Sequence, residues 1–279
     1  RNAWRFADLG RQREAKAEIE SSLGWVHEQL GDMEKALGYY RAAVQSDPDS
    51  ADARHRLGAA LVRIGQYRAG ADELQAALRF NPQLAQAYNH LGIAWVRLGR
   101  PTEAQRNYEL AIRMLETQLT EQQRERRQLR GDLADTCVNL ANLYLTQGKR
   151  AEAMRLYRRA VDLAPKSALV RLSLVQGYLA IGDVPAATRV AEAGVHDFPS
   201  EARMHFALAR LLVHQGREQQ AVEHLTLAAI HDPQLPEARA GLEEVRQVNQ
   251  TAQIRAACGV GLLEIAAADH ARAQRWNDA

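Results

Sequence analysis

The residue types that most often do chemistry in proteins are present in this chain, but without the spacing that their chemistry needs. The two cysteines, Cys137 and Cys258, are too few for a disulfide framework and do not have metal-ligand spacing. Cys137 falls at an apolar helical position, where a buried free thiol is expected. The nine histidines are not paired at metal-ligand spacing, so we expect each to be a surface or packed side chain.

Catalytic motifs are equally missing from the sequence. Two glycines occur in the run CGVG at 258–261, but no strand precedes them and the dinucleotide-binding pattern is incomplete. There is no Gly-x-Ser-x-Gly, no P-loop and no His-Glu-x-x-His. Carboxylates such as Glu243 are expected on a solvated helix face. We therefore predict that the protein is not an enzyme and has no catalytic residue, no cofactor and no metal.

The composition is that of an ordinary folded protein. The chain has 279 residues, of which 46% are apolar and 25% charged, with a formal net charge of +2. This balance gives no overall electrostatic drive toward nucleic acid or membrane. No apolar run approaches the roughly 18 residues that span a bilayer. The start at Arg1 suggests a processed chain or a fragment, so both a cytoplasmic and an exported protein stay open.

An internal sequence repeat defines the secondary-structure elements on which any functional site must lie. Leu-Gly recurs every 34 residues in the first half of the chain, and Leu recurs at the same period in the second half. A further Gly stands eight residues after each of these leucines. The leucines are Leu23, Leu57, Leu91, Leu140, Leu174 and Leu208, and the glycines are Gly31, Gly65, Gly99, Gly148, Gly182 and Gly216.

Each repeat predicts two helices. In the fourth unit apolar residues follow helical spacing twice, first around Leu140 and then around Tyr157. Gly148 between them is placed to end the first helix in a left-handed turn. Proline near the end of the second helix, as at Pro165, stops it before the next unit. One such pair cannot bury its own apolar faces, so stacking of pairs must form the core.

This pattern resembles the tetratricopeptide repeat over 17–50, 51–84, 85–118, 134–167, 168–201 and 202–235. Small residues such as Ala36 and Ala104, and aromatics such as Tyr40 and Tyr108, stand where that family has them, whereas Leu74 departs from it. The resemblance implies an all-α fold, a right-handed α-solenoid of about six helix pairs with a C-terminal capping helix. We divide the chain into an N-terminal helical extension (1–16), repeats 1–3 (17–118), an insertion that lengthens the flanking helices (119–133), repeats 4–6 (134–235), and a capping helix with a tail helix (236–279).

The resemblance also implies where a partner binds. The family's concave groove is lined by the second, fifth, ninth and twelfth positions of each first helix, and Leu169 is one such position here. In the later repeats these positions are largely apolar, with a polar row among them, which favours binding of a helix or extended peptide of another protein. The predicted groove residues are Val138, Asn142, Leu145, Leu172, Gln176, Leu179, Phe206, Arg210 and Val213. Two alternatives stay open: these side chains pack between helices, or segment 262–276 folds back into the groove.

A second hypothesis makes the chain its own partner. The terminal segments carry apolar residues that have no place in the repeat, and an end that enters a neighbour's groove would give rings or filaments. These residues are Trp4 and Phe6 at one end and Leu262, Leu263 and Trp276 at the other. A third class, an accessory domain of a larger protein, also stays open. The partners that we predict are therefore another protein or peptide, or the chain itself, without nucleic acid and without a membrane span.

Overall fold

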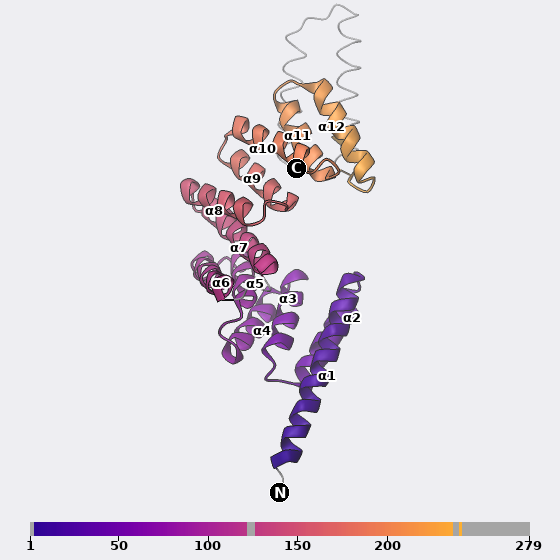
Figure 1. The fold of residues 1–279 in the computed structure, drawn as a ribbon, viewed down its shortest axis with the longest axis vertical. Helices are drawn as coiled ribbons and strands as arrows, with labels where there is room; N and C mark the ends of the chain where they lie inside the picture. Colours follow the sequence, from indigo (N-terminus) through magenta and orange to yellow (C-terminus); the bar gives the residue numbers. More distant parts are fainter. Residues whose placement is uncertain (1–2, 122–125, 237–239, 242–279) are drawn as a thin grey trace, which may run out of the picture. The chain divides into compact units, whose positions relative to one another are not determined.

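The computed structural model describes residues 3–121, 126–236 and 240–241. Over this part of the chain the structure consists of helices and contains no strand (Figure 1). The helices are α1 (Ala3–Gln29), α2 (Met33–Ser46), α3 (Ala51–Arg63), α4 (Tyr67–Phe80), α5 (Ala85–Arg97), α6 (Pro101–Glu121), α7 (Arg126–Thr146), α8 (Arg150–Leu163), α9 (Ala168–Ala180), α10 (Val184–Asp197), α11 (Ala202–His214) and α12 (Glu218–His231).

These helices confirm the predicted all-α solenoid. The chain divides into two compact units, Arg1–Lys149 with α1 to α7 and Arg150–Ala279 with α8 to α12. Within each unit every helix packs against the next one along the chain, so the core is a row of helix-to-helix interfaces. The capping helix predicted in 236–279 falls almost wholly outside the described residues.

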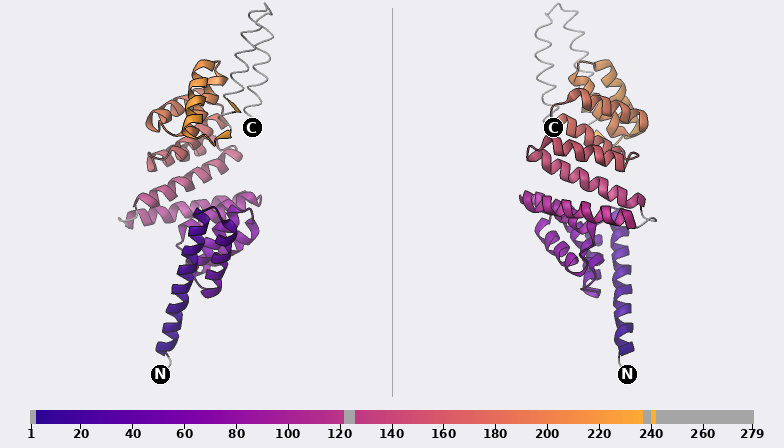
Figure 2. Two further views of the ribbon diagram at one scale, coloured as in Figure 1. Left: turned by 90° about the vertical axis from the view of Figure 1, so that its right-hand side faces the viewer. Right: turned by 60° about the vertical axis from the view of Figure 1, so that its left-hand side comes forward.

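Three helices are longer than the others. α1 has 27 residues and runs without a break from the predicted extension into the first repeat, whereas its partner α2 has 14. The first half of α1 therefore projects beyond α2 (Figures 1 and 2), and residues 11–16 are exposed. α6 and α7 have 21 residues each and hold those parts of the 119–133 insertion that the structure describes.

The glycines that follow the first helices shape the turns. Gly31 has a φ of 80°, in the left-handed region that side chains with a Cβ rarely adopt. Around it the Asp32 amide donates to the His27 carbonyl at 2.9 Å and the Gly31 amide donates to the Glu28 carbonyl at 3.0 Å, which is the pairing of a Schellman motif. The same left-handed glycine occurs at Gly65, Gly99, Gly148, Gly182 and Gly216.

The Leu-Gly motif has a packing role. The ring of Tyr108 lies against the backbone of Gly92, where an added Cβ would come within 2.5 Å of a ring carbon. The glycine therefore lets the two helices of the repeat approach with a buried aromatic between them. The same close approach joins Gly24 to Tyr40 and Gly58 to Leu74.

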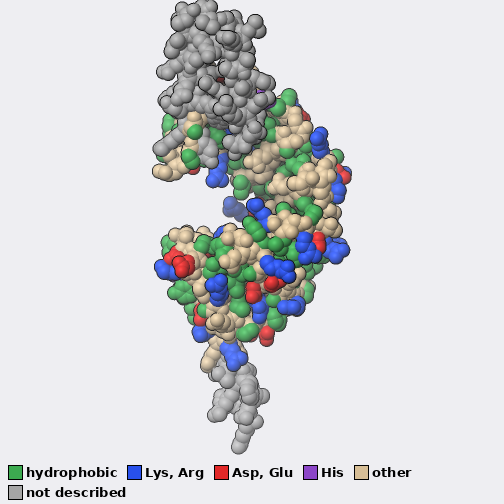
Figure 3. All heavy atoms as spheres, turned by 180° about the vertical axis from the view of Figure 1, so that it is seen from behind, with side chains coloured by type: hydrophobic (Ala, Val, Ile, Leu, Met, Phe, Trp, Pro, Cys, Tyr) green, Lys and Arg blue, Asp and Glu red, His purple; other side chains and the backbone are tan. Residues whose placement is uncertain are grey.

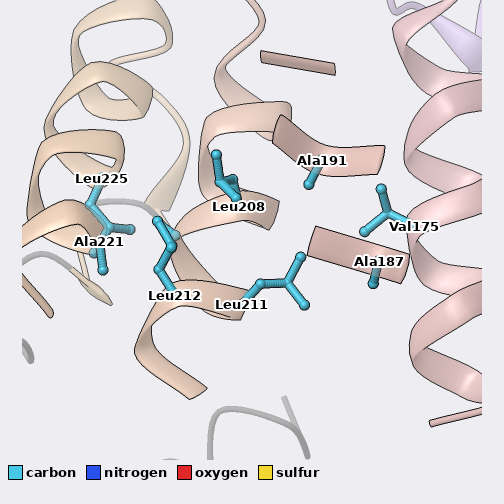
Figure 4. Packing of buried hydrophobic residues seen from close by; sticks show 9 residues of the cluster. Val175, Ala187, Ala191, Leu208, Leu211, Leu212, Ala221 and Leu225 are labelled. Carbon is cyan, nitrogen blue, oxygen red and sulfur yellow. The ribbon is translucent and has the colours of Figure 1, made fainter. Parts of the chain in front are cut away.

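In the fifth repeat, which lies in the second unit, the sizes at these two positions are exchanged. Val175 of α9 stands where the first three repeats have glycine, and Ala191 of α10 stands where they have Tyr or Leu. Figure 4 shows both in one buried cluster, in which Leu208, Leu211 and residues of α12 continue the core. The combined volume of Val175 and Ala191 matches that of Gly58 and Leu74 in the second repeat, although the bulkier side chain has changed helix.

Candidate protein-binding surface

In the first unit the facing first helices are linked by polar side chains. His55 Nε2 of α3 lies 3.1 Å from His90 Nδ1 of α5, and the Asn139 amide donates to Asn89 Oδ1 at 3.0 Å. We call this row of contacts the first-helix ladder, and its members are Glu28–Arg63, His55–His90 and Asn89–Asn139. Because these groups hydrogen-bond to one another, the ladder uses up much of the polar capacity of this face.

The histidine pair of the ladder is neutral. Burial lowers the pKa of His55 to about 3, and the neighbouring His90 lowers it further. Burial, and then the positive charge of Arg63, lower the pKa of His90 as well. One ring therefore donates its N–H to the lone pair of the other, and neither carries charge at neutral pH. Sequence reasoning did not find this pair, although its spacing of 35 residues is close to the repeat period.

The predicted site residues lie in both units. Val138, Asn142 and Leu145 belong to α7 in the first unit, where Asn142 is exposed and the other two are half-buried. The remaining six lie on α9 and α11 in the second unit. We call these six, together with Leu169, the α9–α11 surface: Leu169, Leu172, Gln176, Leu179, Phe206, Arg210 and Val213.

On α9 the side chains of this surface differ in their solvent exposure. Leu169 is 62% exposed and Leu179 is 41% exposed, whereas Leu172 is only 9% exposed. Gln176 lies between the leucines in the sequence and is exposed. Leu172 thus contributes mainly to the fold, whereas Leu169, which also stands at a groove position of the family, is the most exposed leucine on α9.

On α11 the surface rests on the core. Phe206 and Val213 are half-buried and pack against the buried cluster of α9 to α12. The guanidinium of Arg210 lies 5.9 Å from the centre of the Phe206 ring, within cation–π range. The first-helix ladder has no counterpart here, because Leu172 and Ala207 stand at the positions of His55 and His90. At these two positions the second unit is accordingly apolar where the first unit is polar.

A buried histidine supports α11. His205 is 3% exposed, and its Nε2 lies 2.9 Å from the Pro199 carbonyl. A carbonyl only accepts, so Nε2 carries the proton and Nδ1 accepts from His224 Nδ1 at 3.0 Å. Burial, and then His205, lower the pKa of His224. His205 is therefore a satisfied structural side chain, as predicted for a packed histidine.

No reactive constellation was found in the part of the chain that the structure describes. No three His, Cys, Asp or Glu side chains converge there as metal ligands, and none of its helices is long and apolar enough to cross a membrane. Cys137 is a buried thiol, as predicted. Leu262, Leu263 and Trp276 lie outside the described residues, as does Cys258.

The face shown in Figure 3 and the pocket of the first unit do not point to a second binding site. On the face shown in Figure 3, Lys and Arg side chains lie among acidic and hydrophobic ones. A shallow pocket of about 370 Å³ lies between α4, α5 and α6, with Trp95 and Arg106 in its lining. Arg100 covers Trp95 at 4.4 Å and is paired with Glu103, so the pocket's aromatic floor is already occupied.

Solved structures share this fold. A structure of PilF from Pseudomonas aeruginosa has a TM-score of 0.60 and 19% identity, covering 84% of this chain and 99% of that one. The type IV pilus biogenesis factor PilW has a TM-score of 0.64 and 17% identity, covering 81% and 98%. A chain of the APC/C hetero-tetramer Cut9–Hcn1 has a TM-score of 0.60 and 17% identity. The match covers 86% of the present chain but only 44% of the APC/C chain.

Family models agree with the repeat frame. One tetratricopeptide-repeat model matches residues 28–91 and 144–211, a second matches 4–51, and a third matches 84–117. The matched segments together span 4–117 and 144–211, which is more than half of the chain. With its paired helices, left-handed glycine turns and stacked cores, the chain belongs to the tetratricopeptide-repeat family.

Proposed function

We propose that this interaction scaffold binds a helix or an extended segment of another protein on the α9–α11 surface. The observation that carries the proposal is the difference between the two units. The first-helix ladder joins polar groups to one another in the first unit, whereas the α9–α11 surface leaves Leu169 and Leu179 exposed beside half-buried Phe206. Exposed apolar side chains grouped on one face mark a surface that gains free energy when it is covered.

The polar side chains of the α9–α11 surface, Gln176 and Arg210, can hydrogen-bond to a partner and so orient it. Gln176 has both amide donors and an acceptor, and Arg210 presents a guanidinium above Phe206. Peptide backbones and helix ends carry unpaired carbonyl and amide groups, which such side chains can satisfy at the rim of an apolar contact. We therefore expect a partner segment with two or three apolar residues and a free backbone carbonyl edge or helix C-terminus.

The test begins by finding the segment that touches this surface. A photo-crosslinking amino acid at Gln176 in the full chain, irradiated in an extract of the source cells, should label one protein at a defined peptide. That peptide is then synthesised, and its affinity is measured by fluorescence anisotropy. Leu179→Asp should weaken binding about 30-fold, because covering the exposed part of one leucine is worth about 2 kcal/mol.

The matched control is Leu227→Asp in α12, a leucine of the same unit that is 37% exposed and lies off the proposed surface. It should leave affinity unchanged. Equal affinity for the Leu179 variant and the unmodified chain would remove the basis of the proposal. Equal loss in both variants would show that the charge acts on the whole unit and would equally count against it.

The head-to-tail alternative remains a separate hypothesis. Its C-terminal residues lie outside the described part of the chain, and Trp4 and Phe6 lie in the first turns of α1. If these ends join neighbouring copies, deletion of residues 1–16 should convert large assemblies to monomers in light scattering. An unchanged assembly size would exclude this route to self-assembly.

A further inference from the structure

One face of α1 carries an exposed apolar row that the proposed function does not use. Ile19 is 62% exposed, Leu23 40%, Val26 44% and Leu30 74%. Their spacing of four, three and four residues places Ile19, Leu23 and Val26 on one side of α1. Leu30 follows the last residue of the helix and continues the row, because its amide still donates to the Val26 carbonyl at 3.1 Å. We call this row the α1 stripe.

The equivalent positions in later repeats show what kind of element covers such a face. The stripe occupies the third, seventh, tenth and fourteenth positions of the first repeat, counted from Ala17. In later first helices the first three of these positions are buried: Ala53, Leu57 and Ala60; Ala87, Leu91 and Ala94; Val170, Leu174 and Gly177; Met204, Leu208 and Leu211.

The cover over those positions is the second helix of the preceding repeat. A Cβ at Gly177 would come within 2.7 Å of Tyr157 in α8, and Met204 lies against Gly194 of α10 in the same way. Leu57 of α3 shares a buried cluster with Leu37 of α2. The α1 stripe is therefore the continuation of an interface that recurs inside the molecule, with a helix as its complement.

The residues of the stripe favour a particular kind of helix. α3 and α5 have alanine at the third and tenth positions, which lets a bulky second helix come close, whereas α1 has Ile19 and Val26 there. Four large residues at this spacing match the a and d positions of a coiled coil over about one and a half heptads, in which like helices interlock their side chains. In α11 the large Met204 and Leu211 at these positions are buried, and Met204 lies against Gly194 of the second helix α10. The row of α1 also matches a second row of the same kind, as two helices do in a coiled coil.

We propose that the α1 stripe binds the α1 stripe of a second copy of this chain, with the two helices antiparallel. In this arrangement Ile19 faces Leu30 of the other copy and Leu23 faces Val26, so one row complements itself. No charged residue interrupts the row, and the adjacent Lys16 is held by Glu20 of its own helix at 3.7 Å. Consecutive helices joined by a short turn run antiparallel, as α2 and α3 do within the first unit, so each α1 takes for its partner the place of a preceding second helix.

The size of the stripe sets the strength of the dimer. The exposed parts of the four side chains amount to on the order of 400 Å² per copy, below the roughly 800 Å² per partner of a standard stable interface. We expect a reversible dimer with a dissociation constant in the micromolar range. The contact is isologous and closes at two copies, unlike a head-to-tail contact, which continues into rings or filaments.

Sedimentation velocity of the full chain tests this, over concentrations from about 1 to about 200 μM, where a micromolar equilibrium shifts. The unmodified chain should pass from monomer to dimer. Val26→Asp should stay monomeric, with the dissociation constant raised at least tenfold. Val96→Asp, a valine of the same unit that is 41% exposed, should dimerise as the unmodified chain does.

Cysteine pairing tests the orientation. In a background with Cys258→Ser, mixing the single variants Leu23→Cys and Val26→Cys under oxidation should give the mixed disulfide in excess over either homodimer. A monomer at every concentration overturns the proposal, and so does a dimer that survives Val26→Asp. Homodimeric disulfides of Leu23→Cys in excess would show parallel helices and overturn the antiparallel arrangement, and assemblies larger than a dimer would overturn the closed pair.

Discussion

Two glycine-to-alanine substitutions in neighbouring helices should change stability in opposite directions. Gly92 lies in α5 against Tyr108, and Gly131 lies in α7 with no heavy atom within 4 Å of where its Cβ would be. In a helix interior alanine is favoured over glycine by about 1 kcal/mol because glycine loses more backbone entropy on folding. Gly131→Ala should therefore stabilise the protein by about 0.5–1 kcal/mol.

At Gly92 the same methyl group meets the tyrosine ring. It would lie 2.5, 2.7 and 2.9 Å from three ring carbons of Tyr108, which is 2% exposed and cannot move into solvent. Ordinary contact begins near 3.4 Å, so ring and helix must separate by nearly 1 Å. Overpacking of this kind costs about 1–3 kcal/mol, and after the gain in helix propensity Gly92→Ala should destabilise by about 1–2 kcal/mol.

The assay is urea unfolding followed by circular dichroism, with Tyr108→Ala as the partner mutation. In the Tyr108→Ala background the clash is gone, so Gly92→Ala should now stabilise as Gly131→Ala does. If Gly92→Ala and Gly131→Ala had the same effect in the unmodified chain, the close approach of glycine and tyrosine would not limit packing, and the reasoning would fail.

Two further predictions concern pH and a helix cap. The folded-state pKa values of His55, His90 and His224 lie below the usual 6.5, so the unfolded chain binds more protons in mild acid and the urea midpoint should fall between pH 7.5 and 5.5. The fall should be smaller for His55→Gln, and an unchanged midpoint would contradict the neutral His55–His90 pair. Ser167 Oγ accepts a hydrogen bond from the Val170 amide in the first turn of α9, so Ser167→Ala should cost about 1 kcal/mol in the same assay. Exposed Lys166→Ala should cost none, and equal effects would argue against the cap.

The fold was predictable because its signals are local. The spacing of apolar residues around Leu140 reports a helix, and a glycine at Gly148 reports its end, without any knowledge of distant contacts. The 34-residue period then supplied the tertiary arrangement, because each pair repeats the packing of the one before. A single non-repetitive chain would not have given its topology in this way.

The side-chain contacts between repeats were harder to predict. The pairing of His55 with His90 depends on how far α3 and α5 are offset along their axes, and this offset is a property of the stack and not of either helix. Leu172 was assigned to the groove by its position, yet the structure leaves only 9% of it exposed. Leu23 shares the Leu-Gly frame with Leu57, but it is 40% exposed because no described helix precedes α1.

The exchange of sizes between the two helices of a repeat has an evolutionary consequence. Gly58 with Leu74 and Val175 with Ala191 are two solutions to one volume, so the two positions should covary among relatives. Recombination that joined the first half of one of these repeats to the second half of the other would set valine against leucine or glycine against alanine, giving a clash or a cavity. Whole-repeat duplication avoids both, so the heritable unit of this solenoid is the complete helix pair.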